Sequence, residues 1–105
     1  MNIVFLQLGG NLGDRKQLLK DSILAIENRV GNIVDFSKVY ESAPWRVEGQ
    51  NNYLNQIIKV KTTLLACEVL STVLNIEKQL GRIRLEKWGE RLIDIDIIFY
   101  NDSII

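Results

Sequence analysis

Residues 3–30 read IVFLQLGGNLGDRKQLLKDSILAIENRV, and this stretch predicts the first strand and the first helix of the fold. It opens with Ile3 to Leu8, a run that is apolar except for Gln7, and continues into the glycine-rich segment Gly9 to Gly13. An apolar run bounded by such a segment is typical of a buried central strand. The glycines match neither the nucleotide-binding P-loop pattern nor a complete dinucleotide-binding pattern, so they predict only a tight turn from strand to helix.

The second half of this stretch has the periodicity of an amphipathic helix. Asp14 stands where a helix N-cap belongs, and Gly31 stands where a left-handed C-terminal cap belongs. Between them, apolar residues recur at spacings of three and four, which places them on one helix face. These residues are Leu19, Ile23, Ile26 and Val30.

The rest of the chain is predicted to form three more strands and one more helix. Strands are predicted from their β-branched and aromatic content, and the helix from its spacing. The predicted strands are Ile33 to Tyr40, Tyr53 to Thr62 and Leu92 to Tyr100, and residues 41–52 form a long loop between the first two. The predicted helix is Leu65 to Leu80, with Gly81 at its end. Its apolar stripe includes Val69, Leu70, Val73 and Ile76. This β-α-β-β-α-β order predicts an α+β, ferredoxin-like fold: an antiparallel four-stranded sheet with both helices on one face.

Composition bounds the chemistry. The 105 residues carry 13 Lys+Arg and 13 Asp+Glu, no histidine and one cysteine, which predicts a single domain over residues 1–105. The zero net charge gives no global attraction to nucleic acid or to an anionic membrane. Histidine-centred catalysis, histidine-ligated zinc, thiolate clusters and intramolecular disulfides are excluded. Without a membrane-spanning or signal segment, the expected location is the cytoplasm.

The sharpest chemical signal lies in the last predicted strand. Strand alternation places Ile93, Ile95, Ile97 and Phe99 on one face and both Asp94 and Asp96 on the other. The two aspartates are about 6.6 Å apart along the strand, so their carboxylates can share Mg²⁺ ions. The alternative is an ordinary solvent-facing strand edge.

Cations precede this pair. Residues 81–91 contain Arg82, Arg84, Arg91 and Trp88, together with Gly81 and Gly89. Arginine offers a planar donor fork to phosphoryl oxygens, so the segment suits a loop that closes over a nucleotide. The alternative is a solvated loop whose arginines pair with its own glutamates.

Glu77 falls near the middle of the apolar stripe of the second predicted helix. A carboxylate at that position is expected to be buried and to need a partner. Two partners are open: an arginine of the following loop, or a polar ligand such as a sugar hydroxyl.

Tyr53 and Asn55 share one face at the start of the third strand. A flat aromatic beside an amide suits a heterocycle such as a pterin or purine, because the ring stacks and the amide both donates and accepts. Core packing of Tyr53 is the alternative.

Five segments together resemble the 6-hydroxymethyl-7,8-dihydropterin pyrophosphokinase family. They occur in the family's order and span the whole chain: LGGNLGDR at 8–15, YESAP at 40–44, QNNYLNQ at 50–56, IEKQLGR at 76–82 and KWGERLIDIDIIFY at 87–100. The resemblance implies a ferredoxin-like core and transfer of pyrophosphate from ATP to the pterin hydroxymethyl group in folate biosynthesis, with AMP as the other product. It also implies two Mg²⁺ ions, with ATP as co-substrate.

The resemblance also implies roles for individual residues. Asp94 and Asp96 would hold the metal ions, and Arg82 and Arg91 would bind the phosphates and act in catalysis. The nucleotide would be bound by Glu77, Arg84, Trp88, Arg91 and the backbone of Ile97, and the pterin by Tyr53, Asn55 and the backbone around Ser42, Ala43 and Trp45. The partners are therefore small-molecule substrates, with neither nucleic acid nor membrane, and the chain is expected to be a monomer.

The chain departs from the family pattern at four positions and in length. Gly10, Ser42, Arg46 and Glu90 stand where the family usually has Ser, Thr, Gly and Pro. Family members continue past this point with a segment that supplies further ATP contacts and a second aromatic for the pterin. The end after the Asn101-Asp102 turn resembles an interrupted hairpin, so we expect the family's C-terminal segment to be absent here. The alternative function is a non-catalytic small-molecule binding module, or an inactive remnant, on the same fold.

Overall fold

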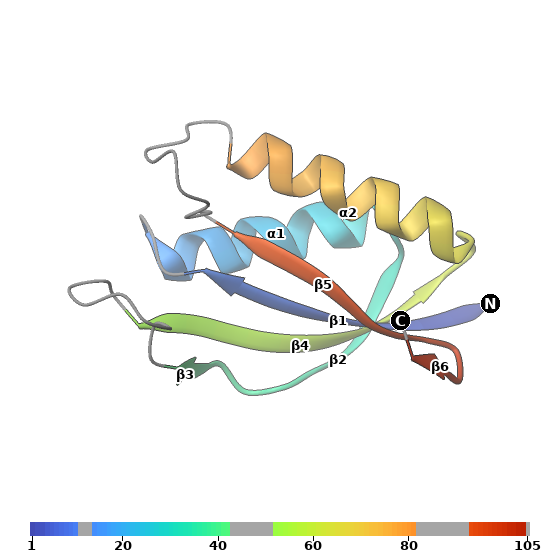
Figure 1. Cartoon of the computed structure of the whole chain (residues 1–105), viewed down its shortest axis with the longest axis horizontal. Helices are drawn as coiled ribbons and strands as arrows, with labels where there is room; N and C mark the ends of the chain where they lie inside the picture. The colour runs from blue at the N-terminus through green and yellow to red at the C-terminus, as the bar shows by residue number, and fades with distance from the viewer. Residues whose placement is uncertain (11–13, 43–51, 82–92, 105) are drawn as a thin grey trace.

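A computed structural model of the chain describes residues 1–10, 14–42, 52–81 and 93–104, and it contains two helices and six strands (Figure 1). Apart from two short additional strands, the elements follow the predicted order. In chain order they are β1 (Asn2–Gly10), α1 (Arg15–Arg29), β2 (Asn32–Phe36), β3 (Tyr40–Ser42), β4 (Tyr53–Thr62), α2 (Ala66–Leu80), β5 (Asp94–Tyr100) and β6 (Ser103–Ile104).

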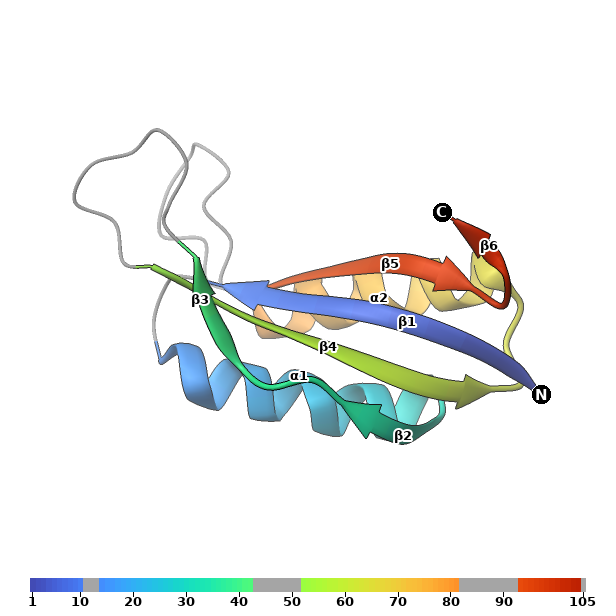
Figure 2. The same cartoon turned by 90° about the horizontal axis from the view of Figure 1, so that it is seen from below.

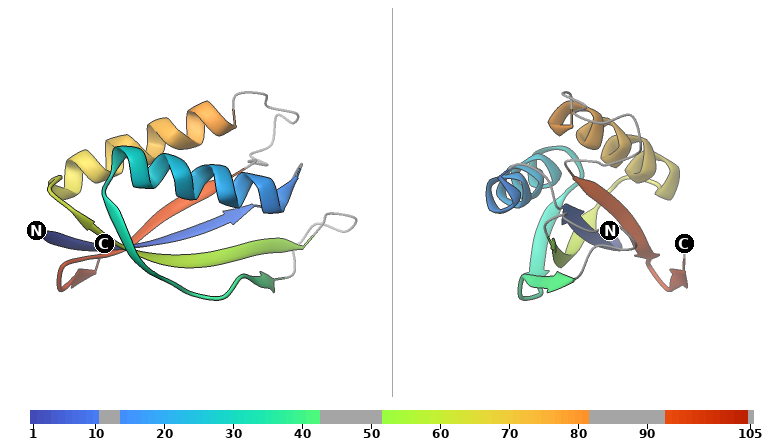
Figure 3. Two further views of the ribbon diagram at one scale, coloured as in Figure 1. Left: turned by 180° about the vertical axis from the view of Figure 1, so that it is seen from behind. Right: turned by 60° about the vertical axis from the view of Figure 1, so that its left-hand side comes forward.

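The strands form one sheet in the order β2-β4-β1-β5-β6, and β3 also pairs with β4. Every pairing is antiparallel. Both helices lie behind the sheet when it is viewed as in Figure 2, so the near face of the sheet carries no helix. Figure 3 shows the two helices side by side on the same face. The predicted ferredoxin-like α+β arrangement is confirmed.

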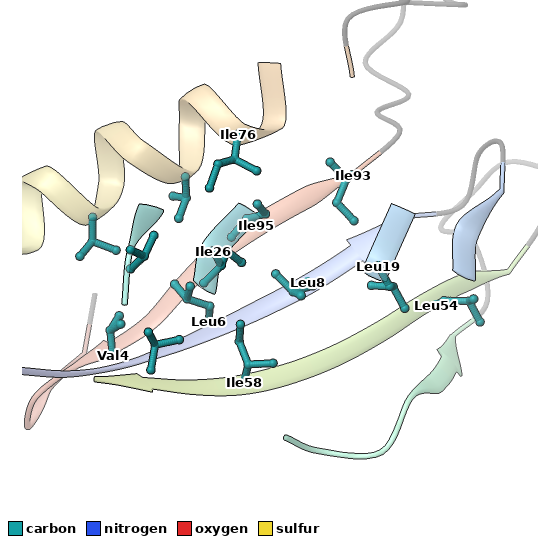
Figure 4. Close-up of a cluster of buried hydrophobic side chains, with 14 residues drawn as sticks. Val4, Leu6, Leu8, Leu19, Ile26, Leu54, Ile58, Ile76, Ile93 and Ile95 are labelled. Carbon is teal, nitrogen blue, oxygen red and sulfur yellow. The ribbon is translucent and has the colours of Figure 1, made fainter. Parts of the chain in front are cut away.

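The hydrophobic core fills the space between the sheet and the two helices (Figure 4). Alternate residues of β1 point into it, because Val4, Leu6 and Leu8 are each fully buried. The helices contribute residues at the predicted spacing. These are Leu19 and Ile26, with Val30 directly after α1, and Val69, Val73 and Ile76 from α2. Within the described residues, no helix is long and apolar enough to cross a membrane.

The two ends of α1 differ in how well the sequence predicts them. Asp14 caps the start as predicted, since its carboxylate accepts a hydrogen bond from the Gln17 amide at 3.1 Å. The prediction of a left-handed cap at Gly31 is wrong, because its φ lies outside the left-handed region. A Cβ at Gly31 would lie 2.0 Å from the Lys61 carbonyl oxygen. Close approach to β4 therefore explains this glycine.

The helix α2 begins with half of a capping box: the Glu68 carboxylate accepts from the Leu65 amide at 2.8 Å, whereas the Leu65 side chain has no acceptor to return the bond. The prediction that Leu70 belongs to its buried stripe is wrong, because Leu70 is 49% exposed. Val69 and Val73 take the buried positions, and Leu70 lies one residue further around the helix.

The strand predicted over residues 33–40 is interrupted. Phe36 pairs with Ile58 and Tyr40 pairs with Asn55, so four steps on this strand face three steps on β4. The hydroxyl of Ser37 accepts from the Ile57 amide at 2.8 Å and replaces a ladder contact there. This extra residue divides the predicted strand into β2 and β3.

A further irregularity lies between β1 and β5, where Leu6 pairs with Ile97 but Phe5 pairs with Phe99. The extra residue on β5 reverses the alternation beyond it. The prediction that Phe99 shares the core face is therefore wrong: it is 37% exposed, and its ring meets Phe5 edge to face at 6.0 Å. Tyr100 takes the core side instead, and its hydroxyl donates to the Leu64 carbonyl at 2.7 Å.

The turn between β5 and β6 is fastened to the start of the chain. Asn101 has a left-handed φ of 53°. Its amide donates to the Ile3 carbonyl at 2.6 Å, and its side-chain oxygen accepts from the Ile3 amide at 2.8 Å. Asparagine tolerates this backbone conformation better than most residues. The single residue Asn101 therefore both forms the turn and joins it to β1.

Candidate active site

A hollow of about 350 Å³ lies on the helix-free face of the sheet. Its residues come from four strands that are adjacent in the sheet but distant in the sequence. They are Gln7 and Gly9 from β1, Ser42 from β3, Tyr53 and Asn55 from β4, and Asp94 and Asp96 from β5. Five of these seven are predicted site residues, so the fold gathers the predicted pterin and metal residues around one space.

The strand register places residues of β4, β1 and β5 side by side in a row across this hollow. Gly9 pairs with Asn55 on one side and with Asp94 on the other. Neighbouring strands lie about 4.8 Å apart, so Asn55 and Asp94 stand about 10 Å apart with a residue that has no side chain between them. The next such row places Gln7 opposite Asp96.

Asp94 and Asp96 both line the hollow, as the strand alternation predicts. Asp94 is half-buried and Asp96 is exposed. Carboxylate oxygens two residues apart on one strand face fit Mg²⁺, a hard cation that takes oxygen ligands and keeps several waters. The described residues contain no group of three or more Asp, Glu, Cys or His that could hold a metal ion. Within the described part of the chain, this pair therefore leaves positions on a bound metal that water or phosphate oxygens would fill.

Ser42 and Asn55 are joined on the opposite side of the hollow. The Asn55 amide nitrogen donates to the Ser42 hydroxyl at 2.8 Å, and Asn55 is only 8% exposed. Ser42 pairs with Tyr53 across β3 and β4, which places all three side chains on the face of the hollow. A half-buried ring beside an oriented amide matches the predicted heterocycle site.

Glu77 is half-buried rather than buried, and one of its partners is neither of the two expected. Its carboxylate oxygen Oε2 accepts from the Ile95 amide at 2.7 Å. The physical reason lies in the sheet edge: β6 pairs only with residues 99 and 100, so Glu77 takes up a β5 amide that no strand reaches. Glu77 thereby ties α2 to the residue between the two aspartates.

Two residues of the hollow, Gln7 and Gly9, are absent from the predicted site. The prediction of a turn beginning at Gly9 is wrong, because Gly9 and Gly10 continue β1 and pair with Asn55 and Leu54. A usable signal exists for Gln7, since it is the one polar residue between core residues of a buried strand and therefore points to the opposite face.

Of the remaining predicted residues, the structure describes Ile97. Ile97 is half-buried and pairs with Leu6, with its side chain against the core. Its proposed backbone contact to a nucleoside stays a prediction, as do the roles of the hollow residues. Residues outside the described part of the chain are Ala43, Trp45, Arg82, Arg84, Trp88 and Arg91, together with the departures Arg46 and Glu90.

Comparison with known proteins places residues 5–105 under one family model, described as 7,8-dihydro-6-hydroxymethylpterin-pyrophosphokinase. A 2-amino-4-hydroxy-6-hydroxymethyldihydropteridine pyrophosphokinase of Aquifex aeolicus is 44% identical over 105 residues, which are all of this chain and 65% of that protein. The Bacillus subtilis protein of the same name is 35% identical over 95% of this chain and 60% of its own length. This chain therefore spans less than two thirds of the length of either relative.

Among solved structures, the wild-type Plasmodium falciparum HPPK-DHPS protein superposes with a TM-score of 0.74 at 18% identity. The superposition covers 96% of this chain and 29% of that one. At this identity the likeness concerns the fold, which agrees with the sheet order and the helix placement described above.

Proposed function

Because the chain belongs to the 7,8-dihydro-6-hydroxymethylpterin-pyrophosphokinase family, we propose that it transfers pyrophosphate from ATP to 6-hydroxymethyl-7,8-dihydropterin in folate biosynthesis. One observation carries the proposal: a single hollow joins a carboxylate pair to an oriented amide and an aromatic ring. A phosphoryl-transfer enzyme needs a metal-binding group and an acceptor-binding group side by side, since most of its catalysis is positioning and charge stabilisation.

The reaction has a defined bond balance. The pterin hydroxyl oxygen forms a bond to the β-phosphorus, and the bond from that phosphorus to the oxygen bridging it to the α-phosphorus breaks. AMP leaves with the bridging oxygen, and the hydroxyl proton passes to solvent. The pterin carries away the β- and γ-phosphoryl groups together.

The metal side of the hollow is assigned to Asp94 and Asp96, which would hold two Mg²⁺ ions. Bound Mg²⁺ neutralises phosphate charge as it develops. The strand itself keeps the two carboxylates at a set separation, and the Glu77 bond to the Ile95 amide holds the backbone between them. This support reduces the reorganisation that the carboxylates need when substrate arrives.

The acceptor side is assigned to Tyr53, Asn55 and Ser42. Tyr53 would stack on the pterin ring, and Asn55 would bind its polar edge. The remaining assignments rest on the family: the backbone at Ala43 and Trp45 for the pterin; Glu77, Arg84, Trp88 and Ile97 for the nucleotide; and Arg82 and Arg91 for the transferring phosphates.

The direct test is AMP formation from ATP by the purified protein, with and without 6-hydroxymethyl-7,8-dihydropterin and Mg²⁺. AMP that appears only when all three are present supports the proposal. Binding of pterin and nucleotide without AMP would instead indicate the alternative, a non-catalytic binding module on the same fold. Calorimetric titration of both ligands distinguishes that outcome from a protein that binds neither.

Arg91→Ala separates catalysis from binding in the same assay. A guanidinium directed at the transferring group stabilises charge that develops only in the transition state. We expect turnover to fall by at least about a hundredfold while ATP affinity changes much less. Arg29→Ala, which removes an exposed arginine that bonds to Gln79 on the helical side, is the matched control. Equal losses of affinity and turnover for Arg91→Ala would contradict its catalytic assignment.

A further inference from the structure

Gly9 lies among the residues that line the hollow. Neither the proposed reaction nor the expected turn explains why this position is a glycine. Its backbone angles lie outside the left-handed region, so an alanine has no conformational difficulty there. The constraint is spatial. A Cβ at residue 9 would lie 2.9 Å from Oδ1 of Asn55, whereas the Leu54 carbonyl oxygen would be at 3.6 Å, an ordinary contact.

The Asn55 carboxamide is thus held from two sides. Its oxygen lies over the bare backbone of Gly9, and its nitrogen donates to the Ser42 hydroxyl at 2.8 Å. With Asn55 only 8% exposed, the amide has little room to rotate. A methyl group at residue 9 would displace the oxygen, and the displacement would strain or break the bond to Ser42.

We propose that Gly9 is a positioning residue for substrate, acting through Asn55, with Ser42 as its counterpart on the other side of the amide. This arrangement leaves the second N–H of Asn55 and an acceptor lone pair of its oxygen available to a ligand. The inference rests on the proposed function and concerns its substrate specificity. Because residue 9 has no side chain, the Asn55 amide can keep its orientation, and this orientation determines which donors and acceptors the edge of the pterin must present.

The first experiment compares Gly9→Ala with the unchanged protein. The probe is 6-hydroxymethylpterin, titrated calorimetrically in the presence of Mg²⁺ and α,β-methylene-ATP. We expect pterin affinity to fall by at least about tenfold, as expected when one hydrogen-bonded contact is misaligned. Affinity for the nucleotide alone and the urea midpoint of unfolding should stay close to the original values, because among the described residues the added methyl contacts only Asn55 closely.

A double-mutant cycle shows whether the effect passes through the amide. In an Asn55→Ala background, Gly9→Ala should change pterin affinity by less than about twofold, since no amide remains to be displaced. If Gly9→Ala costs as much in that background as in the original protein, it acts on the ligand directly and the positioning role is wrong.

Ser42 gives an independent arm with a conservative variant. Ser42→Ala should weaken pterin binding, whereas Ser42→Thr, which keeps the hydroxyl, should retain affinity within about threefold. Ser71→Ala is the matched control, because that exposed hydroxyl donates to the Glu68 carbonyl on α2, away from the hollow. Equal losses for the alanine and threonine variants would overturn the role of the hydroxyl bond.

The outcomes separate this inference from the proposed function. Absence of pterin binding by the unchanged protein overturns the function and this inference with it. An unchanged affinity in Asn55→Ala overturns the assignment of Asn55 and this inference, while AMP formation still decides the function. Weakened binding in Asn55→Ala together with original affinity in Gly9→Ala overturns the inference alone.

Discussion

The two faces of the central strands use alternate residues of the same segments for different purposes. On the helical face, Leu6, Leu8 and Ile95 are buried in the core. On the other face, Gln7 and Asp96 stand opposite each other and line the hollow. A one-residue slip between these strands would exchange the two sets, so stability and chemistry both depend on one register.

The helix-free face itself has two unlike ends. The end at Gly9 carries the polar hollow, whereas the other end carries the Phe5–Phe99 ring pair, with the Lys59 ammonium 5.8 Å from the Phe5 centroid. The extra residue between Ile97 and Phe99 produces this difference, because it turns an aromatic ring out of the core. The bulge therefore makes the Phe5–Phe99 end of this face apolar, while the Gly9 end stays polar.

The largest expected effect is that of Asp96→Asn, which should lower turnover without lowering stability. Turnover in the AMP assay should fall at least about a thousandfold, equivalent to about 4 kcal/mol, because a neutral amide is a poor Mg²⁺ ligand. Unfolding free energy should change by less than about 0.5 kcal/mol, since the side chain is exposed. Asp102→Asn, also exposed, is the control. Turnover within tenfold of the original would remove Asp96 from the metal site.

The adjacent residue should behave in the opposite way. Ile95→Ala removes a side chain that is 4% exposed and should lower the unfolding free energy by about 3 kcal/mol through lost burial and a residual cavity. Urea denaturation gives this value, and turnover per folded molecule without denaturant should stay within a few-fold of the original. A loss below about 1 kcal/mol would mean that this face is not close-packed at β5.

Phe99→Ala tests the bulge between the two ends of the open face. Because the ring is 37% exposed and meets Phe5 edge to face, the expected loss is about 1–2 kcal/mol. A core phenylalanine, as strict alternation would place it, loses about 3–5 kcal/mol on the same change. Thermal and urea unfolding decide between these values, and the larger one would contradict the reversed alternation.

The smallest expected effect is that of Lys59→Met, which keeps the apolar stem and removes the charge above the Phe5 ring. The loss should be about 0.5 kcal/mol, the size of a partly exposed cation–π contact. Lys61→Met, at an exposed position of the same strand, should have no comparable effect. Equal losses in the two variants would assign the effect to general charge and not to the ring.

The element order and most of the core follow from the sequence because periodicity and capping are local properties. The spacing of Leu19 and Ile26 indicates the buried face of α1, and Asp14 indicates its start. The same reasoning places Asp94 with Asp96, and Tyr53 with Asn55, on shared faces. Strand alternation suffices for each pair because no irregularity lies between its members.

The failures share one cause: each depends on a partner strand or helix. No residue type marks the bulge that turns Phe99 outward or the extra residue that splits the strand predicted over 33–40. Gly31 is needed because β4 passes close by, and Glu77 finds the Ile95 amide because β6 is short. The role of Gly9 likewise exists only across strands, where the position of the Asn55 amide decides it.

The pairing of β1 with β5 also has a consequence for how the protein is made. β1 is made before the other described strands, yet one of its two edges pairs with residues roughly 90 positions later, and Asn101 joins the turn after them to Ile3. At about 5–20 residues per second, the nascent chain carries an unpaired central edge for roughly 5–20 s. Native contacts this distant in sequence slow folding. During synthesis, the apolar run Ile3 to Leu8 therefore stays available to a chaperone until β4, and then β5, pairs with it.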